Sequence, residues 1–418
     1  MSKEPDVDRS GPDGSRPEEP RERSRPLRSR PDRSRPDRSG QERSRPARSR
    51  PAVAEPPPDP DAAVPEDAVN FPPAPPTDRW AEDVLGSGFQ ARTLPLHDDD
   101  EGEVVATLVR HVPVEDPGAL PGTPSTPTFA VLYLHGWNDY FYQRELARQW
   151  SALGAAFYAV DLRKYGRSLR EHQTRGYVES LSTYDEDIHA ALRVVRAAHG
   201  VGTDLVLMGH STGGLTAALW AHRHPGALRA LVLNSPWLEL QGSALLRTVS
   251  SPLVSSLARL QPKAVIPTAD PGFYQRTLLG WTDADGPVPT GEEDDPFVTG
   301  WGPEPRWRTS PSAPVRSGWL AAVLAGHAQV AAELQISCPV LVLTSGRSLI
   351  SPRWSAQMRE TDTVLDVEQI RRRALHLGPL VTLARFDGAI HDVTLSARPV
   401  RERVYSELRR WSRAYVLR

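Results

Sequence analysis

Cysteine is almost absent from this chain of 418 residues, which contains only Cys338, so no disulfide can form within it. Cys338 stands in the apolar run "ISCPVLVLTS", where a small buried side chain is expected rather than a nucleophile. The sequence contains no uninterrupted run of 18 apolar residues and no apolar segment close to Met1. It therefore predicts neither a signal peptide nor a membrane-spanning helix, and we expect a cytoplasmic protein.

Aromatic side chains are scarce in residues 1–79, where Phe71 is the only one. This region repeats Arg-Ser-Arg-Pro and then becomes rich in proline and acidic residues. Residues 1–50 contain 14 Arg and one Lys against 10 Asp and Glu, so the basic excess is small and interleaved with acids. A segment of this composition cannot bury enough apolar surface to offset the entropy lost on folding. We predict a disordered tail over residues 1–79 with no clear nucleic-acid partner.

From about Trp80 onward, strand-like and helix-like segments alternate. "RTLPL" and "EVVATLVRHV" predict an opening hairpin, and later short runs rich in β-formers include "TFAVLYLHG", "AAFYAVDL", "DLVLMGH", "LRALVLNSP", "CPVLVLTS" and "LVTLARFDG". Helical patterns such as "YDEDIHAALRVVRAAHG" separate most of these runs. The pattern predicts an α/β fold with a mostly parallel central sheet and helices on both faces.

This alternation is interrupted between Leu238 and about Gln335. Five of the eleven tryptophans lie between Trp237 and Trp319, among many prolines and glycines. We predict a cap or lid insertion over residues 238–335, with the core formed by residues 80–237 and 336–418. The tryptophans are expected to line an apolar pocket in part, while about three of the five build a small core within the cap.

Residues 205–225, "LVLMGHSTGGLTAALWAHRHP", place a Gly-x-Ser-x-Gly motif between a strand and a helix. This context is typical of a nucleophile elbow, a strained turn that exposes a serine hydroxyl above a sheet. Gly209 and Gly213 remove side chains where the tight turn would clash, and Ser211 is expected at positive φ. The N-terminus of the following helix favours a developing negative charge. Ser211 is therefore the predicted nucleophile.

A serine nucleophile needs a base, and the base needs an orienting acid. In this architecture the chain order is serine, acid, histidine. Three histidines follow the elbow helix: His327 lies in the predicted cap, His376 lies at a helix end, and His391 follows a strand and a turn in "ARFDGAIHDV". A loop in that position can place a ring over Ser211, so His391 is the predicted base.

The residues alone leave the acid open. The stretch "TSGRSLIS" after the strand "PVLVLTS" contains no carboxylate, although a regular layout would place the acid there. The next acids are Glu360, Asp362, Asp366 and Glu368. Asp387 and Asp392 flank His391, but neighbours on one loop seldom point back to orient the same ring.

Residues 85–417 resemble α/β-hydrolases of the monoacylglycerol lipase, lysophospholipase and serine aminopeptidase-like group. "LYLHGW" resembles the strand and His-Gly turn that supplies an oxyanion donor, "FYAVDLRKYGRS" the Asp-x-x-Gly-x-Gly-x-Ser segment, "GHSTGG" the elbow and "IHDV" the histidine loop. "TDTVLD" resembles the acid segment, which implies Asp362 as the acid with Asp366 second, despite an insertion of about fifteen residues before it. The resemblance also implies an oxyanion hole formed by the backbone N–H groups of Trp137 and Thr212.

We therefore expect a serine hydrolase that cleaves carboxylic esters through an acyl-enzyme on Ser211. The resemblance implies monoacylglycerol-like or lysophospholipid-like substrates. The alternatives are an acyltransferase or peptidase with the same triad, or a non-catalytic scaffold that binds a ligand or partner, which the displaced acid would favour. The histidines show no metal-ligand spacing, so neither a cofactor nor a metal is expected. The expected partner is a small acyl ester, with at most transient contact with a membrane surface.

Overall fold

The computed structural model describes residues 71–240, 251–267 and 270–417. Most of the predicted tail, residues 1–70, lies outside this part of the chain. Residues 71–79 were also assigned to the tail, but they lie beside strand β2. The backbone N–H of Thr93 in β2 donates to the carbonyl of Pro76 at 2.9 Å, and its hydroxyl donates to the carbonyl of Pro75 at 2.5 Å. These residues are therefore attached to the folded domain.

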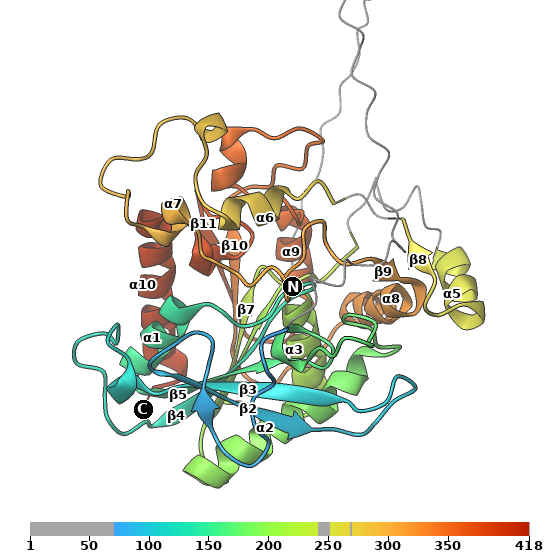
Figure 1. Ribbon diagram of the computed structural model, residues 1–418, viewed down its shortest axis with the longest axis horizontal. Helices are drawn as coiled ribbons and strands as arrows, with labels where there is room; N and C mark the ends of the chain where they lie inside the picture. Colours follow the sequence, from blue (N-terminus) through green and yellow to red (C-terminus); the bar gives the residue numbers. More distant parts are fainter. Residues whose placement is uncertain (1–70, 241–250, 268–269, 418) are drawn as a thin grey trace, which may run out of the picture. The chain divides into compact units, whose positions relative to one another are not determined.

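Within the described residues, a nine-stranded sheet has the order β1-β2-β3-β5-β4-β6-β7-β10-β11 (Figure 1). Its strands are β1 Ala81–Glu82, β2 Phe89–Pro95, β3 Val105–His111, β4 Phe129–Leu134, β5 Ala155–Asp161, β6 Leu205–His210, β7 Ala230–Asn234, β10 Val340–Ser345 and β11 Val381–Phe386. The pairs from β1 to β5 are antiparallel, and those from β5 to β11 are parallel. The predicted hairpin and mostly parallel sheet are confirmed.

Helices follow most of these strands. The α-helices are α1 Arg144–Ala152, α2 Tyr184–His199, α3 Thr212–Arg223, α5 Ser251–Leu260, α6 Phe273–Leu278, α7 Pro296–Thr299, α8 Ser317–Ala331, α9 Val367–Ala374 and α10 Arg398–Tyr415. Short 3₁₀ helices are η2 Pro113–Glu115, η3 Gly166–Ser168, η4 Leu181–Thr183, η5 Asp283–Asp285, η6 Ala356–Glu360 and η7 Val393–Leu395. No helix in the described ranges is long and apolar enough to cross a membrane.

Strand β4 shows why both faces of the sheet are covered. All six of its residues are buried, and successive side chains of a strand point to opposite faces. Val131 packs in one core with Trp150 of α1 and Trp411 of α10. Leu132 packs in the other core with Leu219 of α3. Both faces of this apolar strand are therefore buried, one by α1 and α10 and the other by α2 and α3 (Figure 1).

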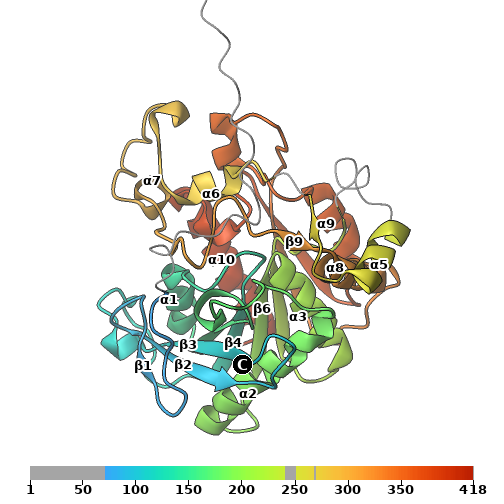
Figure 2. The same ribbon diagram turned by 45° about the vertical axis from the view of Figure 1, so that its right-hand side comes forward.

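The predicted cap occupies the interval between β7 and β10. Its described part contains α5 to α8 and a two-stranded sheet of β8 Val265–Ile266 and β9 Val315–Arg316. Figure 2 shows α6 and α7 on the side of the sheet where β6 ends and α3 begins. Because the carboxyl ends of parallel strands meet at one edge of a sheet, this segment lies where ligands of such sheets gather.

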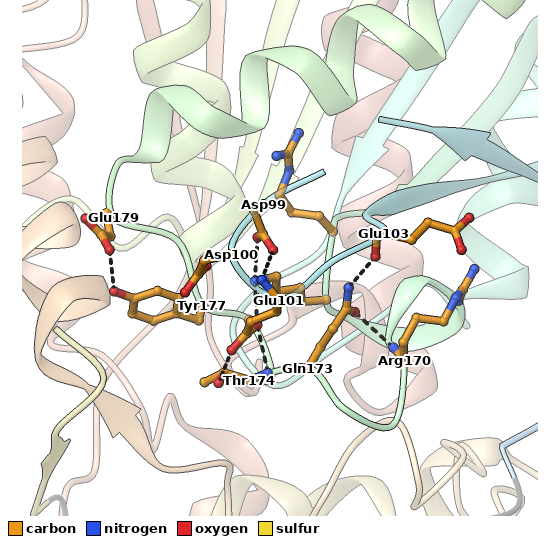
Figure 3. Close-up of polar contacts among 12 residues, drawn as sticks. Asp99, Asp100, Glu101, Glu103, Arg170, Gln173, Thr174, Tyr177 and Glu179 are labelled. Carbon is orange, nitrogen blue, oxygen red and sulfur yellow. Dashed lines mark hydrogen bonds and ion pairs between the residues drawn. The ribbon is translucent and has the colours of Figure 1, made fainter. Parts of the chain in front are cut away.

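The loop between β2 and β3 ties the sheet to the cap. The ammonium of Lys164 contacts carboxylate oxygens of Asp99 and Glu101, both at 2.6 Å, and Lys263 of the cap contacts Glu101 at 2.8 Å. Figure 3 shows Glu101 also accepting hydrogen bonds from Thr174. Burial alone would raise the pKa of Glu101, but the hydrogen bonds from Lys164, Lys263 and Thr174 lower it to about 2. Ion pairs between this loop and Lys263 therefore attach one side of the cap to the sheet.

Candidate active site

The turn between β6 and α3 is strained around Ser211, which has φ 54° and ψ −119°. Its N–H donates to the carbonyl of Asn234 at 3.0 Å, and its own carbonyl accepts from Gly214 and Leu215 at the start of α3. A Cβ at Gly213 would lie 2.2 Å from the carbonyl oxygen of His135, so only glycine fits there. The neighbouring segments therefore hold a non-glycine residue at positive φ, as the motif predicts.

The ring of His391 stands in the loop after β11, with 2 % of the residue exposed. Its Nδ1 lies 2.8 Å from Oδ2 of Asp362. The ring centroids of His210 and of Tyr274 from α6 lie 4.8 and 5.1 Å from that of His391. Packing and one carboxylate therefore fix the ring orientation.

Asp362 is fully buried, and both of its carboxylate oxygens are bonded. Oδ1 accepts from the N–H groups of Val364 and Leu365, both at 2.8 Å, and Oδ2 contacts His391. The second choice for the acid, Asp366, instead caps α9 by accepting from the N–H of Glu368. Of the two carboxylates, the structure brings only Asp362 to the histidine.

The insertion before Asp362 leaves the sheet and returns to it. Asp362 donates its N–H to Arg347 at 3.0 Å, and its carbonyl accepts from Leu349 at 2.9 Å. These bonds, with the parallel bridge to Ser348, place the acid beside the end of β10. The loop therefore restores the position that a regular layout gives to the acid.

Ser211 and His391 line one cavity of about 360 Å³. Within the described residues, the Ser211 hydroxyl has no hydrogen-bond partner, so it is free to face this cavity. Hydrogen bonds between a nucleophile and its base are often long without substrate and tighten when it binds. The two groups are therefore placed to act on the same ligand.

Two backbone N–H groups near Ser211 in the chain or in space have no backbone acceptor within the described ranges. Among the residues that the structure describes, none accepts a hydrogen bond from the N–H of Trp137 or of Thr212. A Cβ at Gly136 would lie 3.0 Å from the Cβ of Ser211, so the loop passes close to the serine. His135 supports the loop, with Nδ1 at 2.8 Å from the Gly136 carbonyl and Nε2 accepting from Leu162 at 3.1 Å. Free donors at the N-terminus of α3 suit a developing oxyanion.

Asn234, at the end of β7, was not predicted as a site residue, yet it joins the elbow to the histidine loop. Its carbonyl accepts from Ser211 and contacts Nδ1 of His210 at 3.1 Å. Its side chain donates to Asp392 at 2.6 Å and accepts from Val393 at 3.2 Å. The carboxylate of Asp392 is thus bonded to Asn234, while Nδ1 of His391 is bonded to Asp362, as expected for neighbours on one loop. Asparagine at a strand end carried no distinctive sequence signal.

Burial and neighbouring polar groups together shift the pKa values of His210 and Asp392, the two buried titratable groups next to His391. Burial lowers the pKa of His210, an effect that the His391 ring adds to and Asp392 opposes. For Asp392, burial alone would raise the pKa, but His210 and the hydrogen bonds from Thr394 and Asn234 lower it. Two buried groups next to His391 are thus held as a neutral ring and a carboxylate.

The cap interval lines the cavity with the aromatic side chains of Phe273 and Tyr274, but not with its tryptophans. None of the five tryptophans between Trp237 and Trp319 lines it, within the described part of the chain. Trp281, Trp301 and Trp307 belong to a small core with Phe297, and Trp237 and Trp319 pack against the main core. The expectation of a partly tryptophan-lined pocket is wrong, because these large rings are buried between elements. Polar walls come from Asn138, Asp139, Gln275, Arg308, Thr309, Ser312, Ser351 and Thr363.

A second Ser-His-Asp chain lies elsewhere. Nδ1 of His111 is 2.7 Å from the Ser151 hydroxyl, and Nε2 is 2.9 Å from Asp116, which Arg148 also contacts at 2.7 Å. The residues Ser151, His111 and Asp116 are 2, 6 and 6 % exposed. Ser151 lies inside α1 and lines none of the described cavities. This chain is structural, so hydrogen bonding alone does not identify the nucleophile.

The other two candidate histidines lie away from the cavity. His327 lies in α8 with Nε2 at 3.0 Å from the carbonyl of Trp237, and His376 follows α9. Neither lines the cavity of Ser211. Over the described ranges, no group of three His, Cys, Asp or Glu side chains is placed to hold a metal ion.

Comparisons with known proteins place this geometry in a family. The family model described as serine aminopeptidase, S33, matches residues 125–395. A monoacylglycerol lipase of Mycolicibacterium smegmatis is 32% identical over 116 residues, which cover 27% of this chain and 40% of that protein. A phospholipase of Bacillus subtilis, YtpA, is 29% identical over 118 residues, which cover 28% of this chain and 43% of that protein. The matched segments thus span less than half of each relative.

Solved structures share the fold. A soluble variant of monoglyceride lipase from Saccharomyces cerevisiae aligns with 83% of this chain and 99% of its own, with a TM-score of 0.53 and 14% identity. A carboxyl esterase from Bacillus coagulans aligns with 78% of this chain and 98% of its own, with a TM-score of 0.54 and 15% identity. The predicted architecture around a parallel sheet is therefore confirmed.

Proposed function

The chain belongs to the serine aminopeptidase S33 family of α/β-hydrolases, and we propose that it is a serine hydrolase that cleaves carboxylic esters. The observation that carries the proposal is that Ser211, His391 and Trp137 line one cavity, while the N–H groups of Trp137 and of Thr212, the residue after the serine, have no backbone acceptor in the described part of the chain. These are the parts that acyl transfer requires: a nucleophile, a base and donors for the oxyanion.

In the proposed first step, His391 accepts the proton of Ser211 while the serine oxygen attacks the ester carbonyl carbon. The carbonyl oxygen becomes an oxyanion, held by the N–H groups of Trp137 and Thr212. His391 then donates its proton to the departing alcohol, which leaves an acyl-enzyme. A water molecule, deprotonated by the same ring, attacks the acyl carbon and releases the acid.

Asp362 acts through His391 in this scheme. Its carboxylate lies 2.8 Å from Nδ1, so it favours the tautomer with the proton on Nδ1 and leaves Nε2 free to act as base. It also stabilises the imidazolium that forms during attack. The two N–H donors on the other carboxylate oxygen hold the carboxylate in place beside the ring.

The charges of the cavity favour a neutral ester such as a monoacylglycerol over a lysophospholipid. Arg308 is the one Lys or Arg among the described residues that line the cavity. It is engaged by Asp139 at 2.7 Å. A substrate phosphate would therefore find no unpaired cation there, while Asp270 adds a negative charge.

The non-catalytic scaffold is the second candidate, and its argument was the displaced acid. The return of the insertion places Asp362 within hydrogen-bond distance of His391, which counts against it. An acyltransferase or peptidase would use the same triad and differ only in the acceptor or the bond cleaved.

Labelling with a fluorophosphonate, followed by intact mass, tests the proposal. We expect one adduct on the wild type and none on Ser211→Ala, together with turnover of monoacylglycerol above that of the matching lysophospholipid. A folded wild type without adduct or turnover would favour the scaffold. Cleavage of amino-terminal peptide amides without ester turnover would favour the peptidase.

A further inference from the structure

The loop after β4, which carries the proposed oxyanion donor and is called the oxyanion loop below, contacts the cap through three consecutive residues, Trp137, Asn138 and Asp139. The ring of Trp137 packs on Trp319 of α8, with centroids 4.0 Å apart. The side chain of Asn138 bonds to Thr309, and Asp139 forms an ion pair with Arg308 at 2.7 Å. These partners follow the loop by about 170 to 180 residues in sequence, so the contacts exist only when the cap is seated.

The contacts of Asn138 are the most directional of the three. Its Nδ2 donates to the carbonyl of Thr309 at 2.8 Å, and its Oδ1 accepts from the Thr309 hydroxyl at 3.0 Å and from the N–H of Ala313 at 3.4 Å. Its own carbonyl accepts a long bond from Arg308 at 3.5 Å. Both ends of the amide are therefore matched to one segment of the cap, residues 308–313.

The backbone of Asn138 is also unusual, with φ 52°. Residues other than glycine rarely adopt this left-handed conformation, and asparagine tolerates it best. The proposed oxyanion donor, the Trp137 N–H, belongs to the Gly136–Trp137 peptide unit, which is separated from Asn138 by the single peptide unit between Trp137 and Asn138. A change in the dihedral angles at Asn138 would therefore release the loop directly beside that donor.

We propose that Asn138 is a positioning residue: its bonds to Thr309 and Ala313 of the cap hold the oxyanion loop so that the Trp137 N–H faces the reacting carbonyl. The inference rests on the proposed serine hydrolase and deepens it, because it makes the seated cap part of the oxyanion hole. Asn138 itself does not touch the reacting atoms in this scheme. Its contribution appears in the transition state, when the carbonyl oxygen gains charge.

The test replaces Asn138 by glycine, which keeps the left-handed backbone and removes the bonds to the cap. Removing one oxyanion donor lowers turnover by about a hundred- to a thousandfold, and a displaced donor should cost about 10- to 100-fold. We expect kcat to fall by this factor while KM for the ester changes little, because the ground-state carbonyl uses the donor weakly.

An alkyl trifluoromethyl ketone provides a readout that a merely structural role would not change. The serine oxygen adds to its carbonyl carbon, the serine proton passes to His391, and the carbonyl oxygen becomes an alkoxide that the oxyanion hole must hold. Inhibition by this ketone should weaken in Asn138→Gly by about the same factor as kcat.

Two further variants make the test specific. Thr309→Val removes one of the three bonds from the cap side and leaves Asn138 intact, so a smaller effect in the same direction is expected even if Asn138→Gly folds poorly. Lys263→Met breaks the ion pairs of the cap with Asp100 and Glu101 and leaves the contacts of Asn138 in place. It should retain the kcat of the wild type.

The outcomes separate the two proposals. An active wild type with unchanged kcat and ketone inhibition in folded Asn138→Gly would overturn the role of Asn138 alone. An equal loss of kcat in Lys263→Met would also overturn it, since general loosening of the cap would then be the cause. A wild type that is neither labelled nor active would overturn the hydrolase and this inference together.

Discussion

Oδ2 of Asp362 lies 2.8 Å from Nδ1 of His391, although an insertion of about fifteen residues separates Asp362 from the end of β10. The backbone bonds to Arg347 and Leu349 on either side of the loop make this contact possible. The added length of this loop costs little free energy, since the entropy of closing a flexible loop rises only slowly with its length. The residues between these two ends of the insertion pack against the cap, for example through Arg359 and Asp285.

Asp362→Asn should lower kcat by about ten-thousandfold, because the amide no longer fixes the productive tautomer of His391. The matched control is Asp366→Asn, four residues away. Asparagine caps a helix as well as aspartate does, so this variant should keep both kcat and stability. Ester turnover of the two purified variants decides the matter. Equal losses in both would contradict the assignment of the acid.

Arg359→Met should lower the free energy of unfolding by about 3 kcal/mol, because the buried carboxylate of Asp285 loses its nearest cation and keeps only the more distant Arg276 at 3.8 Å. Arg359 is 1 % exposed and contacts Asp285 at 2.9 Å, with its guanidinium 4.7 Å from the ring of Trp281. The control is Arg353→Met, an exposed residue of the same insertion. Urea unfolding followed by tryptophan fluorescence measures the stability of both variants. Equal stability would contradict the proposed contribution of the Arg359–Asp285 ion pair.

The partner of Arg359 adds a pH signature to the same experiment. Burial alone would raise the pKa of Asp285, but hydrogen bonds from Arg359 and Thr282 lower it to about 2. The ionised acid thus stabilises the folded state above its ordinary value of 3.8, and this stability is lost as the pH falls towards 2. In Arg359→Met that loss should be smaller.

Ser151→Ala should cost about 1 to 3 kcal/mol of stability, because Nδ1 of the buried His111 loses its partner. The ester kcat and the fluorophosphonate adduct should both remain, in contrast to Ser211→Ala. Thermal unfolding and intact mass measure the two effects on one sample. Loss of the adduct in folded Ser151→Ala would mean that the wrong serine has been chosen.

Stability should fall as the pH drops from about 6.5 to about 4, in part because of His327. Burial lowers its pKa to about 4, an effect that Arg373 adds to and that Trp237 and Glu239 oppose. The unfolded chain binds a proton below 6.5 while the folded state resists it, so the stability present above 6.5 is lost towards 4, by about 3 kcal/mol. His327→Gln should flatten this slope in unfolding curves recorded across that range. An unchanged slope would contradict it.

Local patterns carried much of the fold and part of the site. Continuous apolar runs such as β4, residues 129–134, predicted buried parallel strands because both faces of such strands are covered. The elbow was recognisable because Gly209 and Gly213 stand where a tight turn leaves no room for side chains. His391 was recognisable from its place after a late strand. These features depend on neighbouring residues alone.

Other features depended on contacts between distant segments. The tryptophans of the cap were expected at the pocket in part, but hydrophobic burial draws them into cores, and composition cannot tell a lining ring from a packed one. The structural chain of Ser151, His111 and Asp116 has no motif at all.

Short-range sterics and hydrophobic periodicity are written in the sequence, and they fix the strand-helix alternation, the glycine-framed turn at Ser211 and the order in which a nucleophile and a histidine occur. The choice between Asp362 and Asp366, and the contact of Asn138 with Thr309, become visible only in the folded chain. Such choices depend on where an insertion returns and where a cap is seated. Both result from hydrogen bonds and packing between segments far apart in the chain, which no local pattern encodes.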